Sequence, residues 1–469
     1  MYNLSVYSIK DDPYLEQISY IARRVGVKAY LVGGAIRDSF LGRQTNDYDF
    51  VVFGNIELLA KKISSEFLCK TISFKKKLKT FRIFCNLKTI DISEPRGSTL
   101  EEDLRRRDFT INSIAYDFDE DRFIDPMNGI TDIERKIIRA NSENSIVDDP
   151  LRIMRGFRLG AQFRFDIEPK TLRNFDEKIS LLKSVSRERI TQELKLFFKL
   201  NETFAYLLLM DKVGLIDTLF EDLALTNGCL QSSKHLYDVK THSLSVYNYL
   251  EWAIVRIGKI LGKHHKKYLV HFETKRELLL PALKLAALFH DSGKPFTKVV
   301  VDGKAKFPGH EIKSAEIFEK YAKIYPFGKK ITELTKFFIL NHIKPSNIYR
   351  AWSMGELDDG MKIDFFLEYG EYGIDILIFA LADTLAKGKI RATNREVYIS
   401  FLREMAQFYY SVERKLKEKS VISGKDILEH YPDIERRKIR WILKQIKKLE
   451  LLGGIRTREE ALATLPRLV

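Results

Sequence analysis

The chain has 469 residues, of which 45% are hydrophobic and 30% are charged, so it is not a mostly disordered protein and has room for roughly two to four soluble domains. Lysine and arginine outnumber aspartate and glutamate by 79 to 64, which gives a formal net charge of +15. That excess favours a polyanionic partner, with nucleic acid first, although a merely basic surface would carry the same charge.

Membrane insertion and secretion are not indicated. No stretch approaches the ~20 apolar residues of a membrane span, so we expect no membrane partner. The first twenty residues contain acidic side chains and lack an apolar core, and we expect neither a signal nor a transit peptide. The three cysteines, Cys69, Cys85 and Cys229, form no close pair, which argues against a disulfide framework and a cysteine zinc site. We therefore expect a cytoplasmic protein.

Strands and helices alternate in the first third of the chain. Strands are predicted at 30–32, 47–53, 80–84 and 89–92, and the last two are joined by a turn at 86–88. Apolar residues recur at helical spacing over 55–67. This alternation predicts a small sheet with helices near the N-terminus.

Helices dominate after about residue 140. They are predicted at 150–163, 168–178 and 186–200, and longer ones follow from 235 to about 408. One β-ribbon is predicted at 297–307, with a turn at Asp302 and Gly303. The stretch 413–469 reads as short basic helices joined at Ser423-Gly424 and Gly453-Gly454.

A glycine pair and an Asp-x-Asp pattern stand out near the N-terminus. Gly33 and Gly34 follow a strand and open a helix, where backbone N–H groups can approach a phosphate, although a plain turn would look the same. Asp47 and Asp49 are two apart on the next strand, so their carboxylates lie on one face. Two neighbouring carboxylates favour a cation, and Mg²⁺ with phosphate oxygens is the usual solution. Isolated Asp-x-Asp patterns are also common on surfaces.

Five segments in order resemble a known family. YLVGGAIRDSFLGRQTNDYDFVV resembles the first signature of polymerase-β-type nucleotidyltransferases, specifically the class II tRNA nucleotidyltransferase (CCA-adding or CC-adding) and bacterial poly(A) polymerase family. The second motif, the hinge, the amino-acid template motif and the neck helix of that family are similar to EEDLRRRDFTINSIAYD, FIDPMNGITDIERKIIRA, DDPLRIMRGFRLGAQFRF and SRERITQELKLFF. Together these segments cover roughly residues 28–200.

The resemblance implies roles for particular residues. Asp47 and Asp49 would bind two Mg²⁺ ions that activate an RNA 3′-hydroxyl and steady the leaving pyrophosphate, and Asp91 is the candidate third carboxylate. Asp108 would accept a ribose hydroxyl. The expected nucleotide-binding residues are Gly33, Gly34, Arg37, Arg107, Asp108, Asp149, Arg152, Arg155 and Arg158.

Base selection without a nucleic-acid template can be read from Asp149 and Arg152, three apart on a predicted helix and so on one face. A carboxylate accepts from the exocyclic amino group of C or A, and an arginine donates to their acceptor ring nitrogen. U and G would leave charged groups unpaired and be rejected. The alternative is an ordinary salt bridge at a helix start.

Two departures from the family pattern bear on activity. Asp148 stands where the family often has Glu, a conservative change. Between Asp91 and Arg106 the chain has only ISEPRGSTLEEDLR, whereas members that add C, C and A typically carry a longer flexible loop. The short segment resembles members that add CC and leave the final A to a separate enzyme. We therefore expect CC addition from CTP; ATP use, complete CCA addition and poly(A) synthesis stay open as alternatives.

A second ordered set resembles the HD phosphohydrolase signature over about residues 236–390. The segments ALFHDSGKP, GHEIKSA and LADTLAKG carry it, and imidazoles with carboxylates are sound ligands for a divalent metal. The candidate ligands of this second metal are His242, His290, Asp291, His310 and Asp383. His342 is either a further ligand or a core histidine. The resemblance leaves open whether the domain hydrolyses phosphoesters or serves as scaffold.

The segment 421–465 resembles the C-terminal module of the same enzymes, and its basic helix offers cations to tRNA phosphates. A solvated charged face is the alternative for any one of them. The candidate tRNA-binding residues are Arg436, Arg437, Lys438, Arg440, Lys444 and Lys447, with Lys448 beside them.

The resemblance implies an α+β protein: a polymerase-β-type nucleotidyltransferase head with a small sheet, followed by an all-α neck, HD body and tail. We predict the head at 1–140, a helical neck with the nucleotide-selecting motif at 141–234, the HD domain at 235–400 and a helical tRNA-binding tail at 401–469. The expected function is template-independent addition of CMP to the 3′ end of tRNA by two-metal nucleotidyl transfer.

Overall fold

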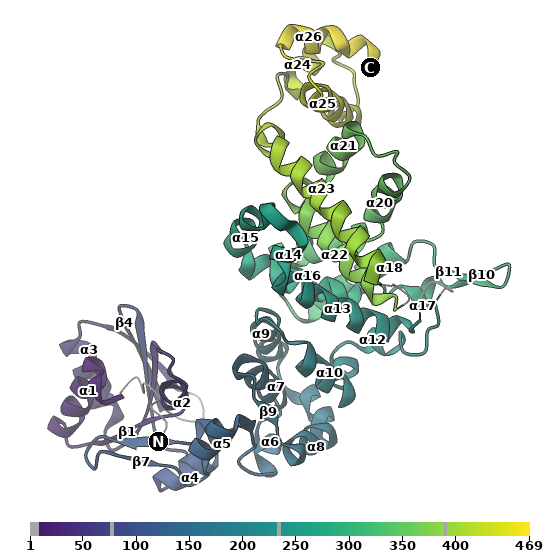
Figure 1. Cartoon of the computed structure of the whole chain (residues 1–469). Coiled ribbons are helices and arrows are strands. Elements are labelled where there is room, and N and C mark those ends of the chain that lie inside the picture. The colour runs from purple at the N-terminus through teal and green to yellow at the C-terminus, as the bar shows by residue number, and fades with distance from the viewer. Residues whose placement is uncertain (1–8, 76–78, 232–235, 389–391) are drawn as a thin grey trace. The chain divides into compact units, whose positions relative to one another are not determined.

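The computed structural model describes residues 9–75, 79–231, 236–388 and 392–469. The chain divides into two compact units, Met1–Thr218 and Leu219–Val469, called here the N-terminal and C-terminal units (Figure 1). Within the described residues, no helix is long and apolar enough to cross a membrane. The four predicted domains subdivide these units and stay a prediction; the predicted HD start at residue 235 lies outside the described residues.

The N-terminal unit contains a seven-stranded sheet in the order β3-β4-β5-β2-β1-β6-β7 (Figure 1). Neighbouring strands are antiparallel except for the central pair β2 and β5, which is parallel. All four predicted strands are present as β1, β2, β4 and β5, whereas β3, β6 and β7 were not predicted. The strands are β1 (Lys28–Val32), β2 (Asp47–Phe53), β3 (Lys70–Lys75), β4 (Lys79–Cys85), β5 (Lys88–Ser93), β6 (Ala115–Asp117) and β7 (Arg122–Ile124).

One face of the sheet is covered, and the other is open around Asp47 and Asp49 but closed around Val51, which packs in an apolar cluster with Leu104. In β2, Tyr48 and Phe50 are buried on the covered face, while Asp47 and Asp49 alternate with them and are exposed. Helix α3 (Ile56–Glu66) packs on β3, β4 and β5, and α1 (Pro13–Arg24) packs on α3 and β1. The period of two therefore leaves the predicted catalytic carboxylates on the open face.

A disulfide joins Cys69 and Cys85, so the expectation of no disulfide is wrong. The cause is the register of β3 against β4, in which Lys70 lies opposite Phe84. The next positions outward are the two cysteines, whose Cα atoms are 5.0 Å apart. A separation of 16 residues hides this contact in the sequence, because it arises only when the two strands pair.

Helices complete the N-terminal unit. The predicted helix at 150–163 begins only at Arg152, so Asp149 lies ahead of it in an extended conformation and does not share a helix with Arg152. Besides α1 and α3, the helices are α2 (Gly34–Phe40), α4 (Leu100–Arg105), α5 (Gly129–Arg135), α6 (Asn144–Asp148), α7 (Arg152–Phe163), α8 (Pro169–Lys178), α9 (Arg187–Phe198), α10 (Phe204–Lys212) and α11 (Leu215–Leu219). A two-residue pairing joins β8 (Ile137–Ile138) to β9 (Asp166–Ile167).

In the described residues of the C-terminal unit, the regular structure is helical apart from one ribbon. Its core forms where α13 packs on α16 and α22, and α16 packs on α19. The predicted ribbon is β10 (Val299–Val301) and β11 (Lys304–Lys306), and Asp302 and Gly303 both have positive φ in its turn. The helices through α22 are α12 (Glu221–Ala224), α13 (Val239–Val255), α14 (Ile257–Leu261), α15 (His265–Thr274), α16 (Arg276–Phe289), α17 (Lys294–Thr297), α18 (His310–Ile324), α19 (Lys329–Asn341), α20 (Pro345–Ser353), α21 (Asp359–Tyr369) and α22 (Gly373–Ala386).

The last helices of this unit form a small bundle of their own. Helix α23 (Ala392–Lys417) runs past residue 413, where short tail helices were predicted to begin. Helices α24 (Gly424–His430), α25 (Arg436–Leu451) and α26 (Arg458–Thr464) follow it and enclose an apolar core around Ile442 and Ile446. Helix α25 also packs against α21.

Candidate active site and metal centre

A cavity of about 600 Å³ opens on the uncovered face of the sheet, beside α7 and α9. Its volume suits a ligand of nucleotide size. Two of the three predicted carboxylates, Asp49 and Asp91, line it, while Asp47 lies just outside the lining. The structure brings all nine predicted nucleotide-binding residues to its wall: Gly33, Gly34, Arg37, Arg107, Asp108, Asp149, Arg152, Arg155 and Arg158.

The strand register places the carboxylates side by side. Asp49 on β2 lies opposite Asp91 on β5, and Asp91 lies opposite Arg82 on β4. Arg82 clamps Asp91 with two hydrogen bonds, from Nε at 2.7 Å and from Nη2 at 2.6 Å. Loss of solvation in the cavity raises the pKa of Asp49. The negative charges of Asp91 and Asp47 raise it further, and the positive charge of Arg107 lowers it. A divalent cation would relieve this crowding of negative charge, so the oxygen donors fit Mg²⁺.

Gly33 allows an arginine to approach the turn after β1. Its φ of +76° is costly for other residues, and a Cβ there would lie 3.2 Å from Nη1 of Arg107. Arg107 is held in this position by Asp103, whose Oδ2 accepts from Nε at 2.9 Å. The glycine therefore lets a guanidinium stand beside Asp49 at the cavity floor.

A chain of buried polar contacts ties the sheet side of the cavity to α7 and α9. Arg37 donates to Oδ1 of Asn112 at 2.6 Å, and Asn112 donates to Asp108 at 3.0 Å. Oδ2 of Asp108 accepts from both Nε and Nη2 of Arg155, at 2.9 and 2.8 Å. Glu193 on α9 then pairs with Arg155. These contacts fix the side chains that form the wall.

Asp108 is the most strongly stabilised carboxylate of this chain of contacts. Burial would raise its pKa, but Arg155, with hydrogen bonds from Asn112 and the Phe109 N–H, outweighs burial and holds the pKa well below the usual range. With its oxygens already engaged by these donors, Asp108 positions Arg155 in the structure. Its predicted contact with a ribose hydroxyl stays a prediction.

The two predicted base-selecting residues each bind protein groups. Oδ2 of Asp149 accepts from Nη2 of Arg189 at 2.7 Å. Arg152 donates to the carbonyl oxygens of Arg106 and Arg107, at 2.8 and 3.0 Å. The alternative of a simple Asp149–Arg152 salt bridge therefore does not describe their contacts. Both side chains face the same cavity from the end of α6 and the start of α7.

Four functional residues were not singled out from the sequence. Arg96, Asn112 and Arg189 line the cavity, and Glu193 pairs with Arg155 and, at 2.5 Å, with Arg158. Arg189 and Glu193 lie inside the SRERITQELKLFF segment, so their family motif was visible although their contacts were not. Asn112 lies within the second motif in the same way.

The short segment after Asp91 is folded back on α4. Oδ1 of Asp103 accepts from the Arg96 N–H at 3.0 Å, and Glu102 accepts from the Ser98 N–H at 2.7 Å. Thr99 caps the helix by accepting from the N–H of Glu102. These bonds attach Arg96, Ser98 and Thr99 to the first turns of α4.

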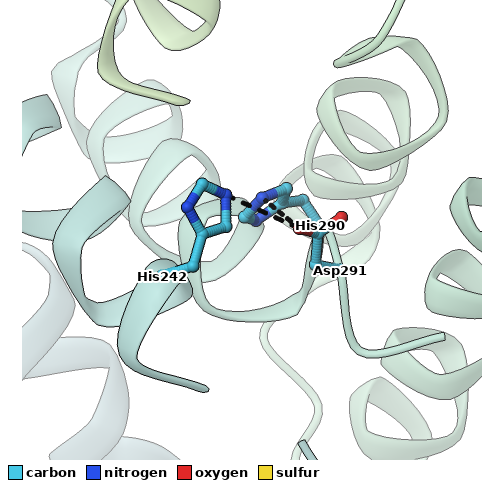
Figure 2. Close-up of side chains that lie close together, drawn as sticks. All are labelled: His242, His290 and Asp291. Carbon is cyan, nitrogen blue, oxygen red and sulfur yellow. Dashed lines mark ion pairs between the residues drawn. The ribbon is translucent and has the colours of Figure 1, made fainter. Parts of the chain in front are cut away.

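The C-terminal unit brings together all five predicted HD residues and also His342. Two groups of three ligand atoms lie within 4.8 Å of one another, and both include Asp291. His242 and His290 turn toward Asp291, with Nε2–Oδ2 distances of 3.6 and 3.3 Å (Figure 2). On the other side of that carboxylate, Nε2 of His310 and of His342 lie 3.3 and 3.7 Å from Oδ1. Asp383 completes the cluster, because its Oδ1 lies 3.0 Å from Nε2 of His242.

The donor set fits a divalent metal. His290 Nε2 and Asp291 Oδ1 are buried and have no hydrogen-bond partner within the part of the chain that the structure describes, and a cation would supply one. Burial, with the charge of His290, lowers the pKa of His342 to about 3, so this imidazole is neutral, as metal binding requires. Two features oppose metal binding. Despite burial, which acts in the other direction, the charges of Asp291 and Asp383 raise the pKa of His290, so a metal would have to displace its proton. Lys294 Nζ lies 2.5 Å from Asp291 Oδ2 and competes for the same carboxylate.

The predicted tRNA-binding side chains of α25 fall into two groups. Lys444 and Lys448 pair with Glu368 and Asp364 of α21, at 3.1 and 2.5 Å, and thereby attach the bundle to the helices before it. Lys447 pairs with Glu450 inside the bundle, and Lys438 donates to the carbonyl of Val469. Lys438 is nevertheless exposed, as are Arg436, Arg437 and Arg440.

Three family models match the chain. They are the poly A polymerase head domain over residues 29–139, the probable RNA and SrmB-binding site of polymerase A over 164–226, and the HD domain over 239–388. The head model covers the open-faced sheet, and the HD model covers the histidine cluster. The fold and the cavity thus define an enzyme, a nucleotidyltransferase with an attached HD domain.

Curated relatives and solved structures match over nearly the full length. The chain is 26% identical to the CC-adding tRNA nucleotidyltransferase of Synechocystis sp., covering 96% of this chain and 95% of that protein. It is 25% identical to the A-adding tRNA nucleotidyltransferase of Deinococcus radiodurans, over 94% and 95%. The CCA-adding enzyme of Thermotoga maritima complexed with tRNA has the same fold, with 21% identity, a TM-score of 0.62 and coverage of 98% and 96%. The chain is thus similar over nearly its full length to tRNA nucleotidyltransferases, and its head matches the poly A polymerase head domain.

Proposed function

We propose that the protein adds CMP from CTP to the 3′ end of tRNA without a nucleic-acid template. The observation that carries the proposal is the single cavity on the open face of the sheet, where the paired Asp49 and Asp91 meet all nine predicted nucleotide-binding residues. The similarity to full-length tRNA nucleotidyltransferases supports a tRNA substrate. The net charge of +15 is consistent with an RNA partner.

In this proposal the head works by placing charges. Asp47, Asp49 and Asp91 would hold Mg²⁺, which when bound neutralises the triphosphate and favours the attacking RNA hydroxylate. Arg107 stands beside the glycine turn, where it would pair with phosphate oxygens. Arg155 reaches the same wall because Asp108 holds it there, so its charge is positioned before the nucleotide arrives.

Base choice would come from Asp149 together with its arginine neighbours. Its carboxylate lines the cavity and can accept from the exocyclic amino group that C and A carry and U lacks. Arg152 and Arg189, which line the same wall, can donate to the acceptor ring nitrogen. A uracil or guanine would place a ring N–H against these donors and leave their charges unpaired, which disfavours binding of either base.

We propose addition of CC and not of the complete CCA. The support is the short stretch between Asp91 and Arg106, which is bonded to α4 through Asp103 and Glu102 and so offers no swinging loop to reshape the pocket for A. CC-adding enzymes of Synechocystis sp. and Thermus thermophilus are among the full-length relatives, as is an A-adding enzyme. The terminal A would then be the work of a separate enzyme on the same tRNA.

The proposed activity is tested with labelled CTP and tRNA that lacks its CCA end. The wild-type chain should incorporate label, and Asp49→Asn should reduce the rate by at least about a thousandfold with an unchanged far-UV spectrum. Asp176→Asn, an exposed carboxylate on α8, is the matched control and should keep full activity. Incorporation by Asp49→Asn at the wild-type rate would remove Asp49 from the metal site.

A second function, metal-dependent phosphoester hydrolysis, is favoured by the cluster around Asp291. Two three-ligand groups share this carboxylate, and its Oδ1 and the neighbouring His290 Nε2 are buried without a hydrogen-bond partner among the described residues. Asp291→Asn should lower the Mn²⁺ retained after dialysis and abolish hydrolysis of a 2′,3′-cyclic nucleotide, while CMP incorporation continues. Hydrolysis that is unchanged in Asp291→Asn would leave this domain as scaffold.

A further inference from the structure

Three large apolar side chains lie exposed on the open face of the sheet, away from its core. Ile72 and Phe74 on β3 and Phe84 on β4 are 48%, 42% and 44% exposed. In the antiparallel register, Ile72 lies opposite Arg82 and Phe74 lies opposite Thr80. Phe84 lies opposite Thr89, which in turn lies opposite Asp47. Residues that pair across strands share a face, so these side chains lie on the face of the catalytic carboxylates.

The apolar group lies on one side of the carboxylates in the strand order of the sheet. Going along the strand order, β3 and β4 carry the apolar side chains, β5 and β2 carry Asp91 and Asp49, and the glycine turn follows β1. With strands about 4.8 Å apart, Ile72 lies about 10 Å from Asp91. The nucleotide cavity extends as far as Thr80 on β4. The apolar group and the glycine turn therefore flank the carboxylates on opposite sides.

The chemistry of this surface suits unpaired nucleotides. Aromatic rings and guanidinium planes are the groups on which single-stranded bases stack. The guanidinium of Arg82 lies 6.0 Å from the centre of the Phe74 ring while it clamps Asp91. Lys70, exposed and opposite Phe84, adds a positive charge at the border for a phosphate. A surface that was only apolar would lack both the arginine and the lysine.

We propose that Ile72, Phe74 and Phe84 form a stacking surface for the single-stranded 3′ end of the acceptor RNA. The proposal rests on the proposed function, which requires an RNA 3′-hydroxyl at the carboxylates opposite the side that receives the triphosphate. The terminal bases stack on β3 and β4, and the chain then crosses β5 to bring its last hydroxyl to Asp91 and Asp49. The surface positions the RNA and takes no part in the chemistry.

The test uses Phe74→Ala/Phe84→Ala in the full chain and tRNA lacking CCA, with 2-aminopurine as its last base. Leu58→Ala is the matched control, because Leu58 is 38% exposed but belongs to α3 on the covered face. The double variant should bind the RNA at least about fivefold more weakly and lose the fluorescence quenching of the stacked base. The KM for CTP should stay unchanged, and Phe74→Tyr/Phe84→Tyr should restore RNA binding.

Three results would overturn the proposal. One is a double variant with wild-type RNA affinity and quenching; another is an equal loss in Leu58→Ala. The third is a wild-type dimer that Phe74→Ala/Phe84→Ala converts to monomer, which would mean that a second copy covers this surface. If the wild-type protein adds no nucleotide to RNA, the proposed function fails separately, and the quenching measurement still decides whether RNA stacks here.

Discussion

Replacing Asp108 by asparagine removes the carboxylate at the centre of the cavity wall while it preserves the shape of the side chain. In the wild-type protein this carboxylate accepts two hydrogen bonds from Arg155, one from Asn112 and one from the Phe109 N–H. The asparagine would keep one acceptor oxygen and turn a second hydrogen-bond donor toward Arg155. We expect Asp108→Asn to destabilise the N-terminal unit and to displace Arg155 from the cavity.

The size of the expected loss of stability depends on the partners that Arg155 keeps in the variant. Removing one partner of a buried ion pair costs about 3–5 kcal/mol when the other charge has no substitute. Arg155 keeps Glu193 at 3.7 Å and a side chain that is 36% exposed, so water and a second carboxylate offset part of the loss. We expect a decrease of about 2–3 kcal/mol in the free energy of unfolding, the range for charged hydrogen bonds.

Hydrogen exchange of the backbone at 104–117, followed through a urea series, reports the unit that contains Asp108. All three tryptophans lie in the C-terminal unit, so their fluorescence gives an internal reference that should not move. Asp176→Asn serves as the exposed-carboxylate control. A change below about 0.5 kcal/mol in Asp108→Asn, the usual effect of a surface substitution, would refute the reasoning.

The pH dependence gives a second check on the same variant. Because the folded pKa of Asp108 is depressed, its contribution is fully present above the ordinary carboxyl pKa of about 3.9 and is lost only as pH falls through the folded value. The stability gap between wild type and Asp108→Asn should therefore stay constant from pH 8 to pH 5. A gap that closes between pH 7 and pH 5 would mean that the carboxyl is protonated there and its pKa is raised.

The remaining predictions concern the C-terminal unit. Lys284 and Glu251 form a buried pair at 2.6 Å, so Glu251→Leu alone should cost about 3–5 kcal/mol by tryptophan fluorescence, and adding Lys284→Met should restore most of it. Burial lowers the pKa of Lys284 to about 8, so the unfolded chain binds more protons between about pH 8 and 10, and the contribution of this lysine to stability should rise with pH across that window. In RNA binding, alanine at the three exposed arginines of α25, Arg436, Arg437 and Arg440, should reduce the slope of log affinity against log salt by about 2–3. An unchanged slope would contradict their assignment.

Several elements of the fold were predicted from local sequence patterns. Strand β2 has the predicted bounds because alternating Asp47, Tyr48, Asp49 and Phe50 satisfy one buried and one open face. The ribbon β10–β11 was also predicted, since an Asp-Gly pair supplies the two positive φ angles of its turn. Such features depend on a few neighbouring residues, and the sequence displays them directly.

Features that depend on pairing partners were missed. Strand β3, with sequence KTISFK, has no buried side to produce a clean alternation, and it is a strand because β4 pairs with it at the sheet edge. The same pairing brings Cys69 to Cys85. Asp149 was placed on a helix because its spacing to Arg152 fits one, but the helix begins at Arg152, and Pro150, which directly follows Asp149, favours the extended conformation of that residue.

The candidate site was largely located through the family resemblance, which named residues but not their contacts. Arg37 meets Asn112 across 75 residues, and Arg158 meets Glu193 across 35. No periodicity links such positions, so the polar chain that holds the cavity wall became visible only in three dimensions. The tail lysines show the converse, because charge alone did not reveal that Lys444 and Lys448 pair with α21.

Extension of tRNA lacking CCA, resolved at single nucleotides, tests the central claim most directly. The protein is incubated with CTP alone, with ATP alone and with both. We predict two added nucleotides with CTP, none with ATP, and no growth past CC when both are present. A third nucleotide with both substrates would make the protein a complete CCA-adding enzyme, long A tails would make it a poly(A) polymerase, and no extension at all would contradict the proposed function.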